Sequence, residues 1–254
     1  MSATVNVQIG QSRYSRIVDV LGERVADRNI YVSPRLKTIY VSNPKCACST
    51  IKLILHRAQI NDPHYLPQDI HARPGNPVPQ PSQIAPHRLE ALLAGEAFRF
   101  NFVRSPYARV VSAYRDKFEY KIFGRLDAGR LLGKQMIRMM ADFGLVTPED
   151  VRAFTFADFV DGLANSDMSR LNLHWRPQVL NVAFGAMEYD MIGRVETFEE
   201  DIRKFGAATG IPIGTLTPRN VRGGSSVVDT YLTPDLAAKV RKAYADDFEA
   251  FGYK

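Results

Sequence analysis

Two short stretches of the sequence combine basic and hydroxyl side chains in a way that suits an anionic ligand. In the first, Asn43 to Thr50 (NPKCACST), small residues leave backbone N–H groups free and Lys45 adds a positive charge. In the second, residues 100–118 (FNFVRSPYARVVSAYRDKF), Arg104 interrupts the passage from a strand to a helix, and Ser112 follows two turns later. A guanidinium is a planar, permanently charged fork for phosphate, and a hydroxyl adds a neutral donor. The two stretches together predict two corners that grip two phosphates of one ligand.

Each corner also has a simpler interpretation when it is taken alone. The first is compatible with a capped helix start that carries a chance lysine, and Ser112 with an ordinary surface serine. The first corner also lacks the G-x-x-x-x-G-K-[ST] pattern, and no carboxylate stands out as a partner for Mg²⁺. The sequence therefore disfavours a nucleoside triphosphate kinase or hydrolase, and we expect no metal.

The elements that must position these corners alternate between strands and helices. Runs of β-branched and aromatic residues predict strands at 30–33 and 39–42, alternating phenylalanines predict one at 98–103, and residues 189–195 resemble a short buried strand. Helical elements are expected at 14–28, 50–59, 88–95 and 106–118. Thr147, Thr155, Thr197 and Thr233 mark further helix starts, with a capping box expected at Thr197 and Glu200. The pattern predicts an α/β fold with a mainly parallel central sheet flanked by helices. No linker divides residues 1–254, so we expect one domain.

A proline-rich segment interrupts this pattern at residues 61–86, which hold seven of the fifteen prolines. Loops of this length within a domain are often functional covers or disordered. We expect this loop and the 123–172 helices to form the walls of a substrate pocket. The loop is a possible substrate cover.

Charge and cysteine content narrow the class of protein. Residues 99–138 carry ten Lys and Arg against three Asp and Glu, a balance of +7 that accounts for the net charge of +6. Cys46 and Cys48 are too close for an unstrained disulfide, so we expect reduced thiols. With no evident signal peptide or membrane span, we expect a soluble, cytoplasmic, bacterial protein.

Both corners resemble motifs of a known family. NPKCACSTIK is similar to the P-K-x-x-C-T-x-x-K loop of sulfotransferases, and FVRSPYARVVSAYRDKF to their F-V-R-x-P-x-x-R-x-x-S-x-Y segment. NLHWRPQ at 172–178, YDMIGRVETFEEDI at 189–202 and YADDFEAFGY at 244–253 extend the resemblance to sulfotransferase family 2, the carbohydrate sulfotransferases. The sequence departs from the family pattern at three positions, with Ser49 for threonine, Ile51 for tryptophan and Ser105 for aspartate.

The resemblance implies a P-loop-like α/β fold and transfer of a sulfuryl group from 3′-phosphoadenosine 5′-phosphosulfate (PAPS) to a hydroxyl of a carbohydrate or glycoconjugate. Arg104 and Ser112 would hold the 3′-phosphate, and Lys45, with Lys52 as an additional candidate, would neutralise the leaving phosphate. The residues expected at the 5′-phosphosulfate are those of the lysine loop: Lys45, Cys46, Ala47, Cys48, Ser49 and Thr50. Arg222 and Gly223 would close over the nucleotide, or belong to a plain loop.

The acceptor hydroxyl also needs a base, and a histidine suits this role near neutral pH. We predict His87, because relatives place a catalytic histidine between the loop and the Arg104 strand. His174 is the alternative base, and His64 and His71 would touch substrate from the loop. Two other functions remain open: a relative that binds nucleotide without catalysis, and a nucleic-acid-binding protein that uses the basic 99–138 segment, although its buried aromatic stripe argues against the latter.

Overall fold

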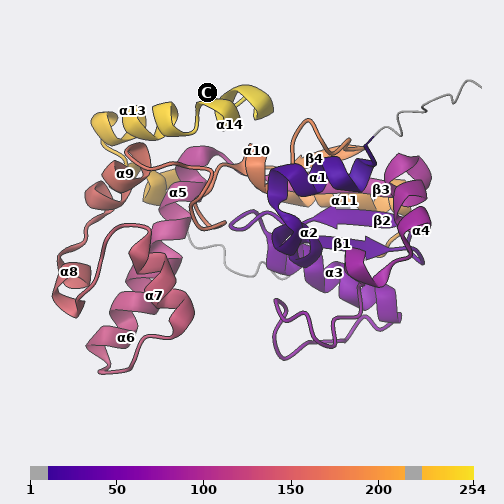
Figure 1. The fold of residues 1–254 in the computed structure, drawn as a ribbon, viewed down its shortest axis with the longest axis horizontal. Coiled ribbons are helices and arrows are strands. Elements are labelled where there is room, and N and C mark those ends of the chain that lie inside the picture. Colours follow the sequence, from indigo (N-terminus) through magenta and orange to yellow (C-terminus); the bar gives the residue numbers. More distant parts are fainter. Residues whose placement is uncertain (1–10, 215–224) are drawn as a thin grey trace, which may run out of the picture.

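The computed structural model describes residues 11–214 and 225–254, and a four-stranded sheet lies at the centre of one half of it (Figure 1). The strands β1 (Ile30–Ser33), β2 (Thr38–Val41), β3 (Phe98–Val103) and β4 (Met191–Arg194) are ordered as they occur in the chain. β1 pairs with β2 in antiparallel orientation, whereas β2–β3 and β3–β4 are parallel. The predicted α/β fold with a mainly parallel sheet is thus confirmed.

Helices cover both faces of this sheet because alternate strand residues point to opposite sides. On one face, Ile30, Val32, Ile39 and Val41 pack with α1 (Arg13–Leu21), α4 (Pro86–Ala91) and the π-helical turn η2 (Leu92–Glu96). On the other, Tyr31, Tyr40, Phe100 and Phe102 pack with α3 (Cys48–Ile60) and α11 (Phe198–Thr209). Both faces are therefore buried, which explains why every residue of β1 and β2 is buried.

A helical lobe forms the other half of the molecule (Figure 1). Its core gathers aromatic side chains, among them Tyr114, Phe118, Phe159 and Trp175. The elements packed there or nearby are α5 (Pro106–Tyr114), η3 (Arg115–Phe123), α6 (Gly124–Asp127), α7 (Lys134–Ala141), α8 (Pro148–Ala153), α9 (Phe156–Ala164), α12 (Ser225–Tyr231), α13 (Pro234–Ala243) and α14 (Ala245–Phe251).

Several predicted helices differ in their boundaries. The helix expected at 14–28 is divided at Gly22, whose φ of 77° ends α1 before α2 (Glu23–Asn29) begins. The capping boxes at Thr147 and Thr155 are present, but the one predicted at Thr197 is wrong. The Thr197 hydroxyl instead donates to the Asp201 carboxylate at 2.7 Å, four residues along the helix.

The proline-rich loop packs against the edge of the sheet at β1. It contains one short 3₁₀ helix, η1 (Pro81–Gln83), and Val32 N–H donates to the Pro79 carbonyl at 2.8 Å. Arg73 donates to the carbonyls of Arg28 and Ile30, and its guanidinium lies 3.8 Å from the centroid of the Tyr31 ring. These contacts cover the exposed sheet edge and fix the loop beside the ends of β1 and α2.

Candidate functional site

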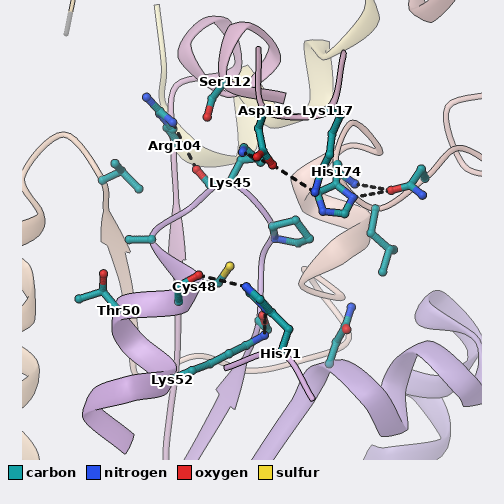
Figure 2. A pocket seen from close by; sticks show the side chains of 18 of the residues that line it. Lys45, Cys48, Thr50, Lys52, His71, Arg104, Ser112, Asp116, Lys117 and His174 are labelled. Atoms are coloured by element: carbon teal, nitrogen blue, oxygen red, sulfur yellow. Dashed lines mark hydrogen bonds and ion pairs between the residues drawn. The ribbon is translucent and has the colours of Figure 1, made fainter. Parts of the chain in front are cut away.

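A cleft of about 2080 Å³ opens where the strands lead into the loops and helices that bear the predicted site residues (Figure 2). The segments that line it follow β2, β3 and β4 in the chain, and residues 69–74 of the proline-rich loop form a further wall. Ligands of α/β sheets bind at the carboxyl ends of parallel strands, as here. Typical pockets for one small ligand measure roughly 300–1,000 Å³, so this cleft has room for a nucleotide and an acceptor together.

The lysine loop between β2 and α3 has an unusual backbone. Lys45 and Ala47 both have positive φ angles, 72° and 56°, which non-glycine residues rarely adopt. The loop is held in this form by Arg109, whose Nε donates to the Pro44 carbonyl at 3.2 Å, and by the Cys46 N–H, which donates to the Asn43 carbonyl at 3.3 Å. The backbone leads directly into α3, where the first N–H groups of the helix meet an anion favourably.

Within this loop the side chains divide between core and cleft. Lys45, Ala47, Cys48, Ser49 and Thr50 line the cleft, and Lys52 lies one turn further along α3. Cys46 does not line it, because its Sγ is buried 3.2 Å from the Gln178 amide oxygen. Both cysteines are unpaired, as predicted.

Arg104 and Ser112 line the same cleft from the end of β3 and from α5 (Figure 2). Burial lowers the pKa of Arg104, but its guanidinium stays charged at neutral pH. Its Nη1 donates to the Lys45 carbonyl at 3.4 Å, so the two predicted corners touch. The structure therefore brings together both basic corners that the sequence predicts.

Gln178, at the start of α10 (Gln178–Asn181), joins the two corners, a role that the sequence analysis missed. Its amide oxygen accepts from the Arg104 N–H at 2.9 Å and from the Asn43 side chain at 3.2 Å. Its amide nitrogen donates to the Arg104 carbonyl at 2.8 Å. Buried Asp247 in turn accepts from the backbone N–H groups of Gln178 and Val179, both at 2.9 Å. Only the NLHWRPQ resemblance pointed towards this residue.

Arg109 is a second residue whose role the sequence did not reveal. It is fully buried, and its guanidinium donates to three carbonyls: Pro44 at 3.2 Å, Leu173 at 2.9 Å and Arg176 at 2.9 Å. These contacts tie the lysine loop to the segment that carries His174. Arg109 therefore positions the site without lining the cleft itself.

His174 lines the cleft, and a hydrogen bond to Asn172 fixes which of its ring nitrogens is protonated. Its Nδ1 lies 2.6 Å from the Asn172 side-chain oxygen, an acceptor, so the proton sits on Nδ1 and Nε2 keeps its lone pair. Burial, then Lys117 and Lys45, hold the pKa of His174 well below its usual range. The imidazole is therefore neutral at physiological pH and able to accept a proton.

Asp116, another residue not predicted, lies among the basic groups of the cleft. One carboxylate oxygen is 3.0 Å from Lys45 Nζ and 3.1 Å from Lys117 Nζ, and the other is 3.5 Å from Lys121 Nζ. Burial acts to raise its pKa, but Lys45 and Lys117 outweigh burial and hold it well below its usual range. Burial lowers the pKa of Lys117 to about 8.

His71 connects the proline-rich loop to α3 through two side-chain contacts. Its Nε2 lies 3.1 Å from the Ser49 hydroxyl and its Nδ1 lies 3.1 Å from Lys52 Nζ. Because a lysine ammonium only donates, Nδ1 accepts and Nε2–H donates to Ser49. Burial, then Lys52, lower the pKa of His71 to about 4. Both ring nitrogens are thus already engaged with residues of the lysine-loop helix.

The structure separates the predicted base His87 from this cleft. His87 is exposed on α4, which precedes β3, whereas Arg104 follows that strand. Six strand residues span roughly 17 Å, and Figure 1 shows α4 at the end of the sheet distant from α5. His64 is also exposed and is not among the cleft-lining residues. The predicted Arg222 and Gly223 lie outside the described residues.

Fold and site define a class: an α/β protein with two basic corners in one cleft at the carboxyl ends of its parallel strands. The family model described as "Sulfotransferase family" matches residues 28–254, and the chain belongs to this family. The match contains both corners, Asp116 and the 172–178 segment.

Three relatives illustrate the similarity. Carbohydrate sulfotransferase 14 of Danio rerio is 30% identical over 241 residues, covering 89% of this chain and 62% of the relative. Carbohydrate sulfotransferase 10 of Xenopus laevis is 26% identical, covering 91% and 68%. Carbohydrate sulfotransferase 12 of Mus musculus is 29% identical, covering 61% and 40%. No solved structure matches the chain. Among the described residues, no helix is long and apolar enough to cross a membrane.

Proposed function

We propose that the protein transfers a sulfuryl group from PAPS to a hydroxyl of a carbohydrate or glycoconjugate. The observation that carries the proposal is the convergence of the Lys45 loop and the Arg104–Ser112 corner in one cleft. Membership of the sulfotransferase family and the carbohydrate sulfotransferases among its relatives support the reaction type and the acceptor class.

The donor fits the groups that the cleft offers. Arg104 and Ser112 supply a charged fork and a hydroxyl for the 3′-phosphate. Lys45, the N–H groups at the start of α3 and the Ser49 and Thr50 hydroxyls face the 5′-phosphosulfate. A nucleotide without the 3′-phosphate would leave Arg104 with no anionic partner, which gives the proposal a direct test.

In the proposed reaction the acceptor oxygen attacks sulfur in line as the bond from sulfur to the phosphate oxygen breaks. The electron pair of that bond stays on the phosphate, where Lys45 neutralises the growing negative charge. The hydroxyl proton passes to a base. The products are a sulfate ester and 3′-phosphoadenosine 5′-phosphate (PAP).

We assign the base to His174 in place of the predicted His87. His174 lies in the cleft with Nε2 unprotonated, whereas both nitrogens of His71 are engaged with Ser49 and Lys52. The lowered pKa makes His174 a weak base, and the negative charge of bound PAPS near Lys45 would offset the lysines and strengthen it.

The two other functions make different demands on the site. A nucleic-acid-binding surface would need several exposed aromatic side chains among its basic residues. Tyr114 and Phe118 are buried in the core of the lobe, and the exposed Tyr120 ring lies against the Arg115 guanidinium, 5.6 Å from its centroid. A relative that only binds nucleotide would need no base, yet His174 is oriented towards the cleft by Asn172. Both observations favour the catalytic proposal.

The test is incubation of the protein with PAPS and a panel of glycans, followed by mass spectrometry for the mass of one sulfuryl group. We expect His174→Ala to lower turnover by about 10²–10⁴, the usual contribution of a general base, while PAP binding is retained. His87→Ala is the matched control and should keep near-normal turnover. The reverse result would return the base to His87, and absence of product with all acceptors despite tight PAP binding would favour the nucleotide-binding relative.

A further inference from the structure

Asp116 is the acidic member of a cluster that otherwise consists of lysines. It lies on η3 within hydrogen-bonding or ion-pair distance of Lys45 from the lysine loop and of Lys117 and Lys121 from its own helix. The Lys45 side chain keeps only 14% of its accessible surface and that of Lys117 only 9%. A carboxylate therefore lies against the ammonium that the proposed function assigns to the donor.

This contact has a physical reason in the protein without ligand. A buried ammonium is costly unless an anion lies beside it, because burial removes its hydration. Burial lowers the pKa of Lys45, and Asp116, first among the charged groups around it, opposes that change. Cys48, His71 and His174 are further titratable groups that interact with the charges of this cluster. Asp116 thus keeps Lys45 charged and ready before the donor arrives.

We infer, on the basis of the proposed function, that the Asp116 carboxylate is an internal substitute for the anionic group of the donor. When the donor binds, its anionic group displaces the carboxylate from Lys45. The carboxylate and a phosphate or sulfate oxygen offer the same kind of acceptor to one ammonium. They compete for Lys45, since two anions on one buried ammonium would repel each other.

The cluster provides the displaced carboxylate with other partners. Asp116 already contacts Lys117 Nζ at 3.1 Å and lies 3.5 Å from Lys121 Nζ, so it moves between ammoniums without becoming an unpaired buried charge. In the free protein Asp116 pairs with Lys45 and Lys117. In the donor complex Asp116 pairs with Lys117 and Lys121, and the Lys45 ammonium pairs with the donor.

The inference has a counterintuitive consequence: removing the acid strengthens donor binding. We expect Asp116→Asn to bind PAP about tenfold more tightly than the wild-type protein in isothermal titration calorimetry, a change equal to about 1.4 kcal/mol. Asp116→Glu keeps the charge and should bind PAP no more tightly than wild type. In Lys45→Ala the added Asp116→Asn substitution should give no tightening, because the shared partner is gone.

Asp229→Asn is the matched control for general electrostatics. Asp229 lines the same cleft and is exposed, so its loss removes one negative charge from the cleft without touching the Asp116 cluster. We expect less than a twofold change. Equal tightening in Asp229→Asn, or no tightening in Asp116→Asn, overturns the inference, whereas PAP binding by the wild type together with sulfated product in the glycan assay still upholds the proposed function. No PAP binding by the wild type overturns both.

A second measurement needs no substitution. In a crystal structure of the wild-type protein with PAP, we expect Asp116 to lie beyond 4 Å from Lys45 Nζ and to remain paired with Lys117 and Lys121, with 4 Å as the usual limit of an ion pair. A Lys45–Asp116 pair that persists at 3.0 Å beside bound PAP would refute the displacement.

Discussion

Gln178 provides the most demanding test of how the two corners are held together. Replacing it by Leu keeps the approximate size of the side chain and removes both polar atoms. Three strongly polar groups then lose a partner: the Arg104 N–H, the Arg104 carbonyl and one N–H of the Asn43 side chain. The Cys46 thiol, a weak donor, also loses an acceptor, and Asp247 loses one donor but keeps the backbone N–H groups of Gln178 and Val179. A buried polar group without a partner costs about 1–3 kcal/mol. At the lower end of this range, about 1 kcal/mol for each of these three groups, the loss is ~3 kcal/mol in all.

Urea unfolding followed by circular dichroism measures this loss, with Gln135→Leu as the control. Gln135 is an exposed cleft-lining residue on α7, and its replacement should change stability by less than about 0.5 kcal/mol. In the same preparation of Gln178→Leu, PAP binding should weaken, since Arg104 and the lysine loop are no longer fixed relative to each other. A Gln178→Leu protein with wild-type stability and wild-type PAP affinity would refute the role of Gln178 as the connection between the corners.

Three further predictions follow from individual contacts. Arg104→Ala should weaken PAP binding by roughly 2–3 kcal/mol, the scale of hydrogen bonds to charged groups, and should have little effect on the already weaker binding of ADP. Calorimetry with both nucleotides checks this. An equal loss of affinity for both nucleotides would contradict the 3′-phosphate assignment. Burial lowers the pKa of His56 and of His71 to about 4, so between about pH 6.5 and pH 4 the unfolded chain binds more protons than the folded protein. The free energy of unfolding should therefore decrease as the pH is lowered through this range. Urea titrations at each pH should show a smaller decrease for His56→Leu, and an unchanged slope would exclude His56 as a contributor. Gly193→Ala would place a Cβ 2.5 Å from the Phe102 ring between β3 and β4 and should lower stability by about 1–3 kcal/mol, measured as a lower melting temperature, whereas Gly133→Ala, with open space around it, should not.

The sequence was sufficient to predict the sheet, most helix starts and the two basic corners, because each depends on local patterns. Short β-branched, aromatic or alternating runs located all four strands, and Pro106, Thr147, Thr155 and Thr233 marked helix starts correctly. Lys45 and Arg104 were recognisable because each is adjacent to a predicted strand-to-helix junction, and Ser112 because it follows two turns along the second of these helices. The parallel sheet then brings such junctions to one edge.

Contacts between distant segments were decided only by the tertiary structure. The choice between His87 and His174 depends on which end of β3 each residue lies near, and chain position places His87 closer in sequence to Arg104 but at the opposite end of the strand. In the sequence Asp116 is one acidic residue in a basic segment, and only the tertiary structure places its carboxylate 3.0 Å from Lys45 Nζ. Arg109 and Gln178 act through carbonyls and amides far along the chain. Backbone carbonyls occur at every residue, so no spacing in the sequence reveals which of them a buried side chain will meet.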